Sequence, residues 1–257
     1  ELRAHLEKLA GELAESIYLR ELAQFTGAES LSAQTFGLVW TSRVQVWSDP
    51  PDKAYLMRDR LESQWLIRNL MPVLRGAREE LLVVSPYFVP GEAGCNEFAA
   101  LARKGVDTRV LTNSLEATDV ALVHAGYSRY RSCLLEGGVQ LYELMPREET
   151  RMALFGSSRA SLHTKSAVVD GRFGFVGSFN VDPRSIQLNT EMGVFFEAPE
   201  LARRLRANFL RSAAADASYR LELRDGALVW EDGSQEPPRL WNREPEAGVF
   251  TRGLIAL

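Results

Sequence analysis

The chain has 257 residues, of which 46% are hydrophobic and 25% charged, a composition typical of globular proteins that excludes disordered and fibrous classes. Its 30 Lys and Arg residues against 34 Asp and Glu residues give a net charge of −4, so no overall positive field attracts nucleic acid. No apolar run is long enough to span a bilayer. The length suits one large domain or two small ones.

Hydrophobic periodicity predicts an opening helix followed by alternating strands and helices. Segment 1–37 has leucines at steps of three and four, which predicts an amphipathic helical segment that packs on the domain or on a missing half. Residues 38–257 are expected to form one domain. Its expected strands are 38–47, 81–85, 108–111, 139–144, 165–169, 173–176 and 192–197. Its expected helices are 57–70, kinked or ended by Pro72, then 96–103, 119–135 and one from Pro199. This succession predicts an α/β fold with a mixed, mostly parallel sheet flanked by helices.

The two cysteines, Cys95 and Cys133, stand far apart in the sequence. Neither belongs to a Cys-x-x-Cys motif or lies near a pair of histidines. The pattern therefore indicates neither a disulfide framework nor a zinc site, and we expect two free thiols in a reducing compartment.

Six residues of chemical interest stand at fixed spacing within 162–184. They read H-x-K-x4-D-x6-G-S-x-N and are His163, Lys165, Asp170, Gly177, Ser178 and Asn180. Alternate residues of a strand share a face, so His163 and Lys165 are expected to point the same way. An imidazole is a nucleophile that can form a phosphoramidate, and an ammonium stabilises the nonbridging oxygens of a phosphate. The pair therefore indicates phosphodiester chemistry.

The other motif residues are expected to support that chemistry. Ser178 and Asn180 can share a face and donate hydrogen bonds to the same phosphate oxygens, and Gly177 lets the backbone approach closely. Asp170 lies at a tight turn between two expected strands. There we expect its carboxylate to fix the turn or Lys165 rather than touch substrate.

These residues resemble the HKD motif of the phospholipase D superfamily, with a match at every fixed position. The resemblance implies a phospholipase D-like layered fold and a site that needs no metal or cofactor. In that family two HKD motifs meet, from two halves of one chain or from a homodimer. One histidine attacks phosphorus and the other protonates the leaving alcohol. His5 and His124 have no lysine two residues on, so this chain carries a single HKD motif and half a site.

A second set of segments is similar to bacterial cardiolipin synthases of the C type, in their C-terminal half. These segments are 85–90 (SPYFVP), 112–115 (TNSL), 118–120 (TDV), 124–127 (HAGY), Arg131, 138–144 and 185–191 (SIQLNTE). The resemblance implies that Glu191 hydrogen-bonds and orients the histidine of the opposite half. It makes His163, Lys165, Asp170 and Glu191 the catalytic candidates. Tyr87 and His124 join the substrate-binding candidates, although a core role for His124 carries equal weight.

The sequence and its resemblance together predict a phosphatidyltransferase half-site. A phosphatidyl group would move through a phosphohistidine to a phospholipid alcohol, with phosphatidylglycerol and possibly phosphatidylethanolamine as substrates. The expected partner is a second HKD half, from a missing N-terminal domain or a homodimer mate, since a chain that begins at Glu1 can be a fragment. The expected location is peripheral, at the cytoplasmic side of the bacterial inner membrane. Two alternatives stay open: a hydrolytic phospholipase D or nuclease, and a noncatalytic lobe that binds lipid or a partner.

Overall fold

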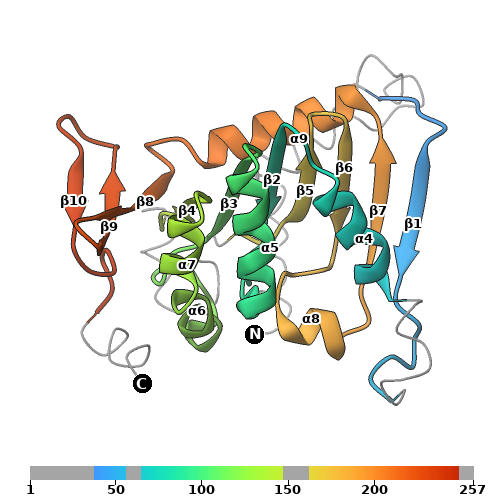
Figure 1. Cartoon of the computed structure of the whole chain (residues 1–257), viewed down its shortest axis with the longest axis horizontal. Coiled ribbons are helices and arrows are strands. Elements are labelled where there is room, and N and C mark those ends of the chain that lie inside the picture. The colour runs from blue at the N-terminus through green and yellow to red at the C-terminus, as the bar shows by residue number, and fades with distance from the viewer. Residues whose placement is uncertain (1–37, 56–64, 147–161, 249–257) are drawn as a thin grey trace, which may run out of the picture. The chain divides into compact units, whose positions relative to one another are not determined.

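The structure is a computed structural model that describes residues 38–55, 65–146 and 162–248 (Figure 1). The chain divides into two compact units, residues 1–42 and residues 43–257. The helical segment predicted for 1–37 lies outside the described residues, as does the first part of the helix predicted for 57–70. The predicted boundary at residue 38 stays a prediction, and the described strands and helices all lie in the second unit.

The described strands form one ten-stranded sheet in the order β1-β7-β6-β5-β2-β3-β4-β8-β9-β10. The strands are β1 (Val44–Ser48), β2 (Glu80–Val84), β3 (Asp107–Asn113), β4 (Gln140–Leu144), β5 (Lys165–Val169), β6 (Phe173–Gly177), β7 (Met192–Glu197), β8 (Ser218–Arg224), β9 (Ala227–Asp232) and β10 (Arg239–Trp241). The helices are α4 (Leu66–Arg75), α5 (Gly91–Arg103), α6 (Ala121–Ser128), α7 (Arg131–Glu136), α8 (Pro183–Gln187) and α9 (Pro199–Ser212). The predicted α/β class with a mixed sheet is confirmed.

The predicted majority of parallel strands is wrong. Among the described strands, β2 with β3 and β3 with β4 are parallel, whereas the other seven pairings are antiparallel. The turn at Asp170 and Gly171 joins β5 to β6, and a connection so short permits only antiparallel neighbours. The hairpin of β8 and β9 adds further antiparallel strands that the sequence reading did not predict.

Helices cover both faces of the sheet and produce three layers (Figure 1). On one face, Leu70 and Leu74 of α4 lie against Ala167 and Phe175 of the central strands. On the other face, Phe209 of α9 lies near Ser166, which neighbours Ala167 and therefore points the opposite way. Apolar strand residues are consequently buried on both faces, as the run in 81–84 illustrates.

Two helices differ from their predicted form. The expected helix over 119–135 is divided into α6, which ends at Ser128, and α7, which begins at the buried Arg131. Pro72 lies within α4 and does not end it. Leu66, Leu70 and Leu74 keep the apolar stripe of α4 in the core on both sides of this proline.

The cysteines are joined, so the prediction of free thiols is wrong. Cys95 of α5 and Cys133 of α7 form a disulfide, with their Cα atoms 6.5 Å apart. Helix α5 precedes β3 and helix α7 precedes β4, and the two helices are neighbours because these strands are adjacent in the sheet. Gly137 helps the close packing, since a Cβ there would lie 2.3 Å from the Cβ of Ala99. A separation of 38 residues concealed this contact in the sequence.

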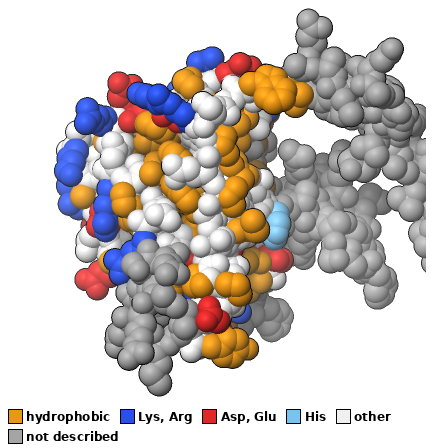
Figure 2. Space-filling view, turned by 90° about the vertical axis from the view of Figure 1, so that its right-hand side faces the viewer, with side chains coloured by type: hydrophobic (Ala, Val, Ile, Leu, Met, Phe, Trp, Pro, Cys, Tyr) orange, Lys and Arg blue, Asp and Glu red, His pale blue; other side chains and the backbone are white. Residues whose placement is uncertain are grey.

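A strip of exposed apolar side chains lies on the β1 side of the sheet. Val46, Val194 and Val176 are partners across β1, β7 and β6 and therefore share one face. Val44 and Met192 lie two residues from Val46 and Val194 on the same strands and therefore on the same face. These five side chains, which we call the apolar strip, are all exposed. Figure 2 shows hydrophobic side chains gathered in a band on this side of the molecule. In the part of the chain that the structure describes, no helix combines the length and hydrophobicity needed to cross a membrane.

Candidate active site

His163 and Lys165 lie together at the start of β5. Lys165 opens the strand and pairs with Gly177 of β6, while His163 precedes the strand and is exposed. The Lys165 Nζ donates a hydrogen bond of 2.7 Å to the carbonyl oxygen of His163. Burial lowers the pKa of Lys165, and the negative charges of Glu191, Asp119 and Asp182 oppose this effect. Lys165 is therefore a buried cation whose ammonium contacts the backbone of His163, and the His163 side chain is exposed.

Glu191 lies on the same edge, held by hydroxyl and amide donors. Ser178, just after β6, donates its hydroxyl to one carboxylate oxygen, and the Met192 amide N–H donates to the Ser178 Oγ at 3.0 Å. The other carboxylate oxygen accepts hydrogen bonds from the Ser185 Oγ at 2.8 Å and the Asn189 Nδ2 at 3.3 Å. Glu191 is therefore a buried carboxylate with a defined orientation. Ser178 is committed to it, a role that the sequence reading did not foresee.

Gly177 and Asn180 occupy the same region with different surroundings. A Cβ on Gly177 would lie 2.4 Å from the carbonyl oxygen of Met192 and 2.7 Å from the Cα of Gly193. Strand β7 therefore lies so close that only glycine fits at position 177, whereas from the sequence we expected the glycine to let the backbone approach the phosphate. Asn180 is buried, and its Oδ1 has no hydrogen-bond partner among the described residues.

Asp170 is separated from the other motif residues. It follows the last residue of β5, so the length of the strand, about 17 Å for five residues, lies between it and Lys165. Its carboxylate accepts hydrogen bonds from the backbone N–H groups of Arg78, Glu79 and Glu80 at 2.8–3.1 Å. Of the two expected roles, the structure supports fixing the turn and does not place Asp170 at the site.

Tyr87 stands within electrostatic reach of the site through Asp119. Its hydroxyl donates to both carboxylate oxygens of Asp119 at 2.9 Å. Burial, reinforced by this hydrogen bond, raises the pKa of Tyr87 to about 12. The negative charge of Asp119 also acts on Lys165, where it opposes the lowering of the Lys165 pKa by burial. Tyr87 therefore remains a substrate-binding candidate.

His124 is buried in the core of the described structure. It is 3% exposed, and its Nε2 lies 2.6 Å from the Arg131 Nη2 and 3.4 Å from the Glu244 Oε1. The guanidinium of Arg131 also donates to Glu143 at 2.9 Å and to Glu244 at 2.5 Å. Of the two roles that the sequence left open for His124, the structure favours the core role, because Arg131 and Glu244, the latter 120 residues away, enclose its side chain.

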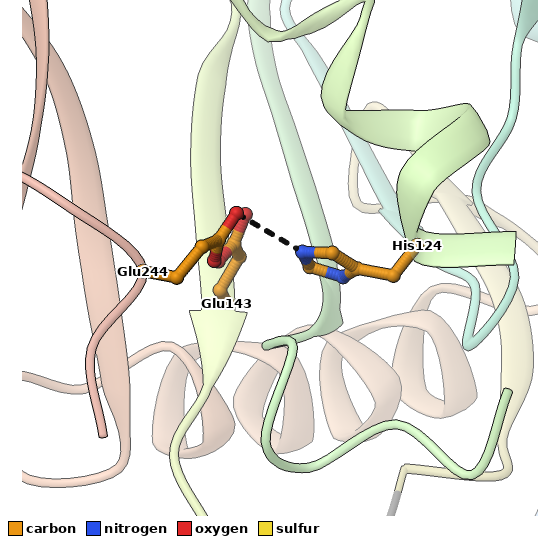
Figure 3. Close-up of side chains that lie close together, drawn as sticks. All are labelled: His124, Glu143 and Glu244. Carbon is orange, nitrogen blue, oxygen red and sulfur yellow. Dashed lines mark hydrogen bonds and ion pairs between the residues drawn. The ribbon is translucent and has the colours of Figure 1, made fainter. Parts of the chain in front are cut away.

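His124, Glu143 and Glu244 also form a group that could hold a metal ion by residue type (Figure 3). Their potential ligand atoms lie within 4.8 Å of one another. The guanidinium of Arg131 contacts all three, so the positive charge at this position is supplied by the protein itself. Burial opposes the charge on Arg131, but Glu143, Tyr127 and Glu244 outweigh it and raise its pKa. These residues do not fit a metal centre.

The family described as "Cardiolipin synthase, PLD-like domain" matches residues 70–213, which include the motif and Glu191. The chain belongs to this family. It is 38% identical over 246 residues to cardiolipin synthase C of Escherichia coli, covering 93% of this chain and 51% of the relative. It is 30% identical over 171 residues to cardiolipin synthase B of the same organism, covering 66% and 36%. The chain thus spans about half or less of the length of these relatives.

A solved structure supports the fold. Phosphatidylserine synthase of Haemophilus influenzae matches with a TM-score of 0.52 at 13% identity, covering 83% of this chain and 44% of that chain. The resemblance to the phospholipase D superfamily, drawn from the HKD motif, and that to cardiolipin synthases, drawn from the segments between 85 and 191, are confirmed. The phospholipase D-like fold class is confirmed as well.

Proposed function

We propose that this chain supplies one half of a phosphatidyltransferase site that makes cardiolipin. The observation that carries the proposal is the arrangement of His163 and Lys165 on one sheet edge with the buried carboxylate of Glu191, in a member of the cardiolipin synthase family. The proposed substrates are phosphatidylglycerol and possibly phosphatidylethanolamine. No cofactor or metal takes part in the proposed reaction.

The proposed chemistry has two steps. An imidazole nitrogen of His163, or of the histidine in the opposite half, attacks phosphorus and forms a P–N bond while the P–O bond to the donor alcohol breaks. The second histidine gives its proton to that leaving oxygen. An acceptor hydroxyl then loses its proton to the same histidine as its oxygen attacks phosphorus and the P–N bond breaks. The ammonium of Lys165 stabilises the charge on the nonbridging oxygens in both steps.

The site requires a second HKD half, which we propose packs against the apolar strip. The strip reaches the site because the backbone N–H of Met192 donates a hydrogen bond to the Ser178 Oγ, and the Ser178 hydroxyl in turn donates to Glu191. Val46, at 63% exposed, and its neighbours leave a contiguous apolar face on this side. The share of the relatives' length that this chain leaves uncovered is large enough for a second such half.

We also propose peripheral contact with the bilayer that holds the substrates; the Cys95–Cys133 disulfide argues against the expected cytoplasmic side, where thiols are kept reduced. Two exposed leucines support this contact. Leu122, 79% exposed, lies three residues from Asp119, and Leu188, 54% exposed, lies three residues from Glu191. Leucines on such positions can enter the interface between headgroups and acyl chains.

The proposal is tested by measuring the solution mass and then the products. Light scattering shows whether the chain pairs with itself, and if it does not, the assay uses the chain joined to a second HKD half. Vesicles of phosphatidylglycerol, with and without phosphatidylethanolamine, should yield cardiolipin, detected by mass spectrometry. Phosphatidic acid in place of cardiolipin would indicate a hydrolytic phospholipase D. Degradation of plasmid DNA in EDTA would indicate a nuclease, and lipid binding without turnover in any assembly would indicate a noncatalytic lobe.

A further inference from the structure

A buried ion pair lies directly behind Glu191. Asp49 and Lys53 occupy the turn that follows β1, and the Lys53 Nζ lies 2.7 Å from the Asp49 Oδ2. Both side chains are 0% exposed, and the ammonium stands 5.0 Å from the ring centre of Trp65. Removing two charges from water is costly, so such a pair is weak evidence for stability alone.

Both members of the pair contact the segment that carries Glu191. The Asp49 Oδ2 accepts a hydrogen bond of 2.9 Å from the Glu191 backbone N–H, and the Asp49 N–H donates to the Glu191 carbonyl at 2.7 Å. The Lys53 Nζ donates to the Ser185 carbonyl at 2.8 Å. Because the Ser185 hydroxyl donates to the Glu191 carboxylate, the pair holds both the backbone of Glu191 and the serine that orients its side chain.

The pair is itself anchored to a rigid element. The second carboxylate oxygen of Asp49, Oδ1, accepts a hydrogen bond of 2.7 Å from the N–H of Leu66 at the start of α4. Leu66 and Leu70 fix that helix in the core. A continuous set of hydrogen bonds therefore leads from α4 through Asp49 and Lys53 to the carboxylate of Glu191.

We propose that Asp49 and Lys53 are positioning residues that hold Glu191 in the orientation in which it binds the histidine of the opposite half. This inference rests on the proposed function. Both residues are buried and cannot touch substrate, so they act through Glu191 alone. A displacement of about 1 Å in a catalytic group can reduce the rate about a hundredfold. The expected loss therefore falls on kcat and leaves KM within about twofold.

The kinetic test uses the complete two-motif assembly and the variants Lys53→Met and Ser185→Ala. Lys53→Met removes the contact to the Ser185 carbonyl, and Ser185→Ala removes only the hydroxyl next to Glu191. Both should reduce kcat about tenfold to a hundredfold. The matched control is Glu143→Gln, which breaks another buried ion pair, that with Arg131, and should lower stability without lowering kcat. A Lys53→Met enzyme that is folded and has the wild-type kcat would overturn the proposal.

A second measurement does not depend on turnover. In the chain labelled with ¹³C at glutamate carboxyl carbons, the Glu191 resonance, assigned by its loss in Glu191→Gln, should move or broaden in Lys53→Met and in Asp49→Asn. Hydrogen exchange at the Glu191 amide should accelerate in Asp49→Asn, and both signals should stay unchanged in Glu143→Gln. An unchanged Glu191 resonance in Lys53→Met would refute the positioning role. Absence of turnover by the wild-type assembly, with the resonance shift present, would refute the proposed function instead.

Discussion

Gly177→Ala tests whether the spacing of β6 and β7 controls the site. The added Cβ would lie 2.4 Å from the Met192 carbonyl oxygen, whereas ordinary contacts begin at 3.4 Å, so the strands must separate by about 1 Å. The strain should cost about 1–3 kcal/mol of unfolding free energy. For a domain of this size the Tm should fall by about 2–12 °C. The same shift moves Ser178 relative to Glu191, and kcat should fall about a hundredfold.

Gly174→Ala is the matched control for this experiment. It lies on the same strand, and its Cβ would come within 2.2 Å of the Phe196 ring, but at the end of β6 away from Ser178. Calorimetry should show a comparable loss of Tm, while cardiolipin formation per folded molecule should stay near wild type. Equal losses of kcat in both variants, or a Gly177→Ala enzyme with wild-type kcat and a lowered Tm, would refute the reasoning.

Three further predictions concern charge, covalent links and metals. The protonated form of Lys165 is the active one, so activity should persist below the lowered pKa of Lys165 and fall as the pH rises through it. A pH–rate profile should therefore show an alkaline decline below pH 10.5, and Lys165→Arg should move that decline to higher pH. Cys95→Ser should lower the unfolding free energy by about 4 kcal/mol in urea titrations, the chain-entropy value for a loop of 38 residues, and an unchanged midpoint would argue against the bond. EDTA should leave turnover unchanged, because Arg131 occupies the candidate metal ligands, and inhibition reversed by added metal would contradict this.

The features predicted well from the sequence depend on short separations. The Lys165 Nζ reaches the carbonyl oxygen of His163 because the two residues are only two positions apart along the chain. The strand 165–169 and its tight turn to β6 follow from a local apolar run that ends at Asp170 and Gly171. The five-residue length of β5 also places Asp170 at the opposite end of the strand from Lys165, and this separation follows from the spacing of the two residues in the motif.

The features missed depend on contacts between distant residues. Lys53 meets Ser185 across 132 positions, and nothing local distinguishes it from a surface lysine. His124 is buried by Glu244, which lies 120 residues away. The predicted direction of strand pairing is wrong for a related reason. The strands that alternate with helices in 80–144 are parallel, whereas the strands of the hairpins that follow are antiparallel.

The most direct test compares cardiolipin formation by the wild-type two-motif assembly with that of His163→Ala, with phosphatidylglycerol vesicles as substrate and mass spectrometry as readout. The account predicts cardiolipin and an acid-labile phosphoenzyme with wild type, and neither product with a folded His163→Ala variant. Full turnover by His163→Ala, or no cardiolipin from a wild-type assembly whose solution mass shows that two motifs are present, would contradict it.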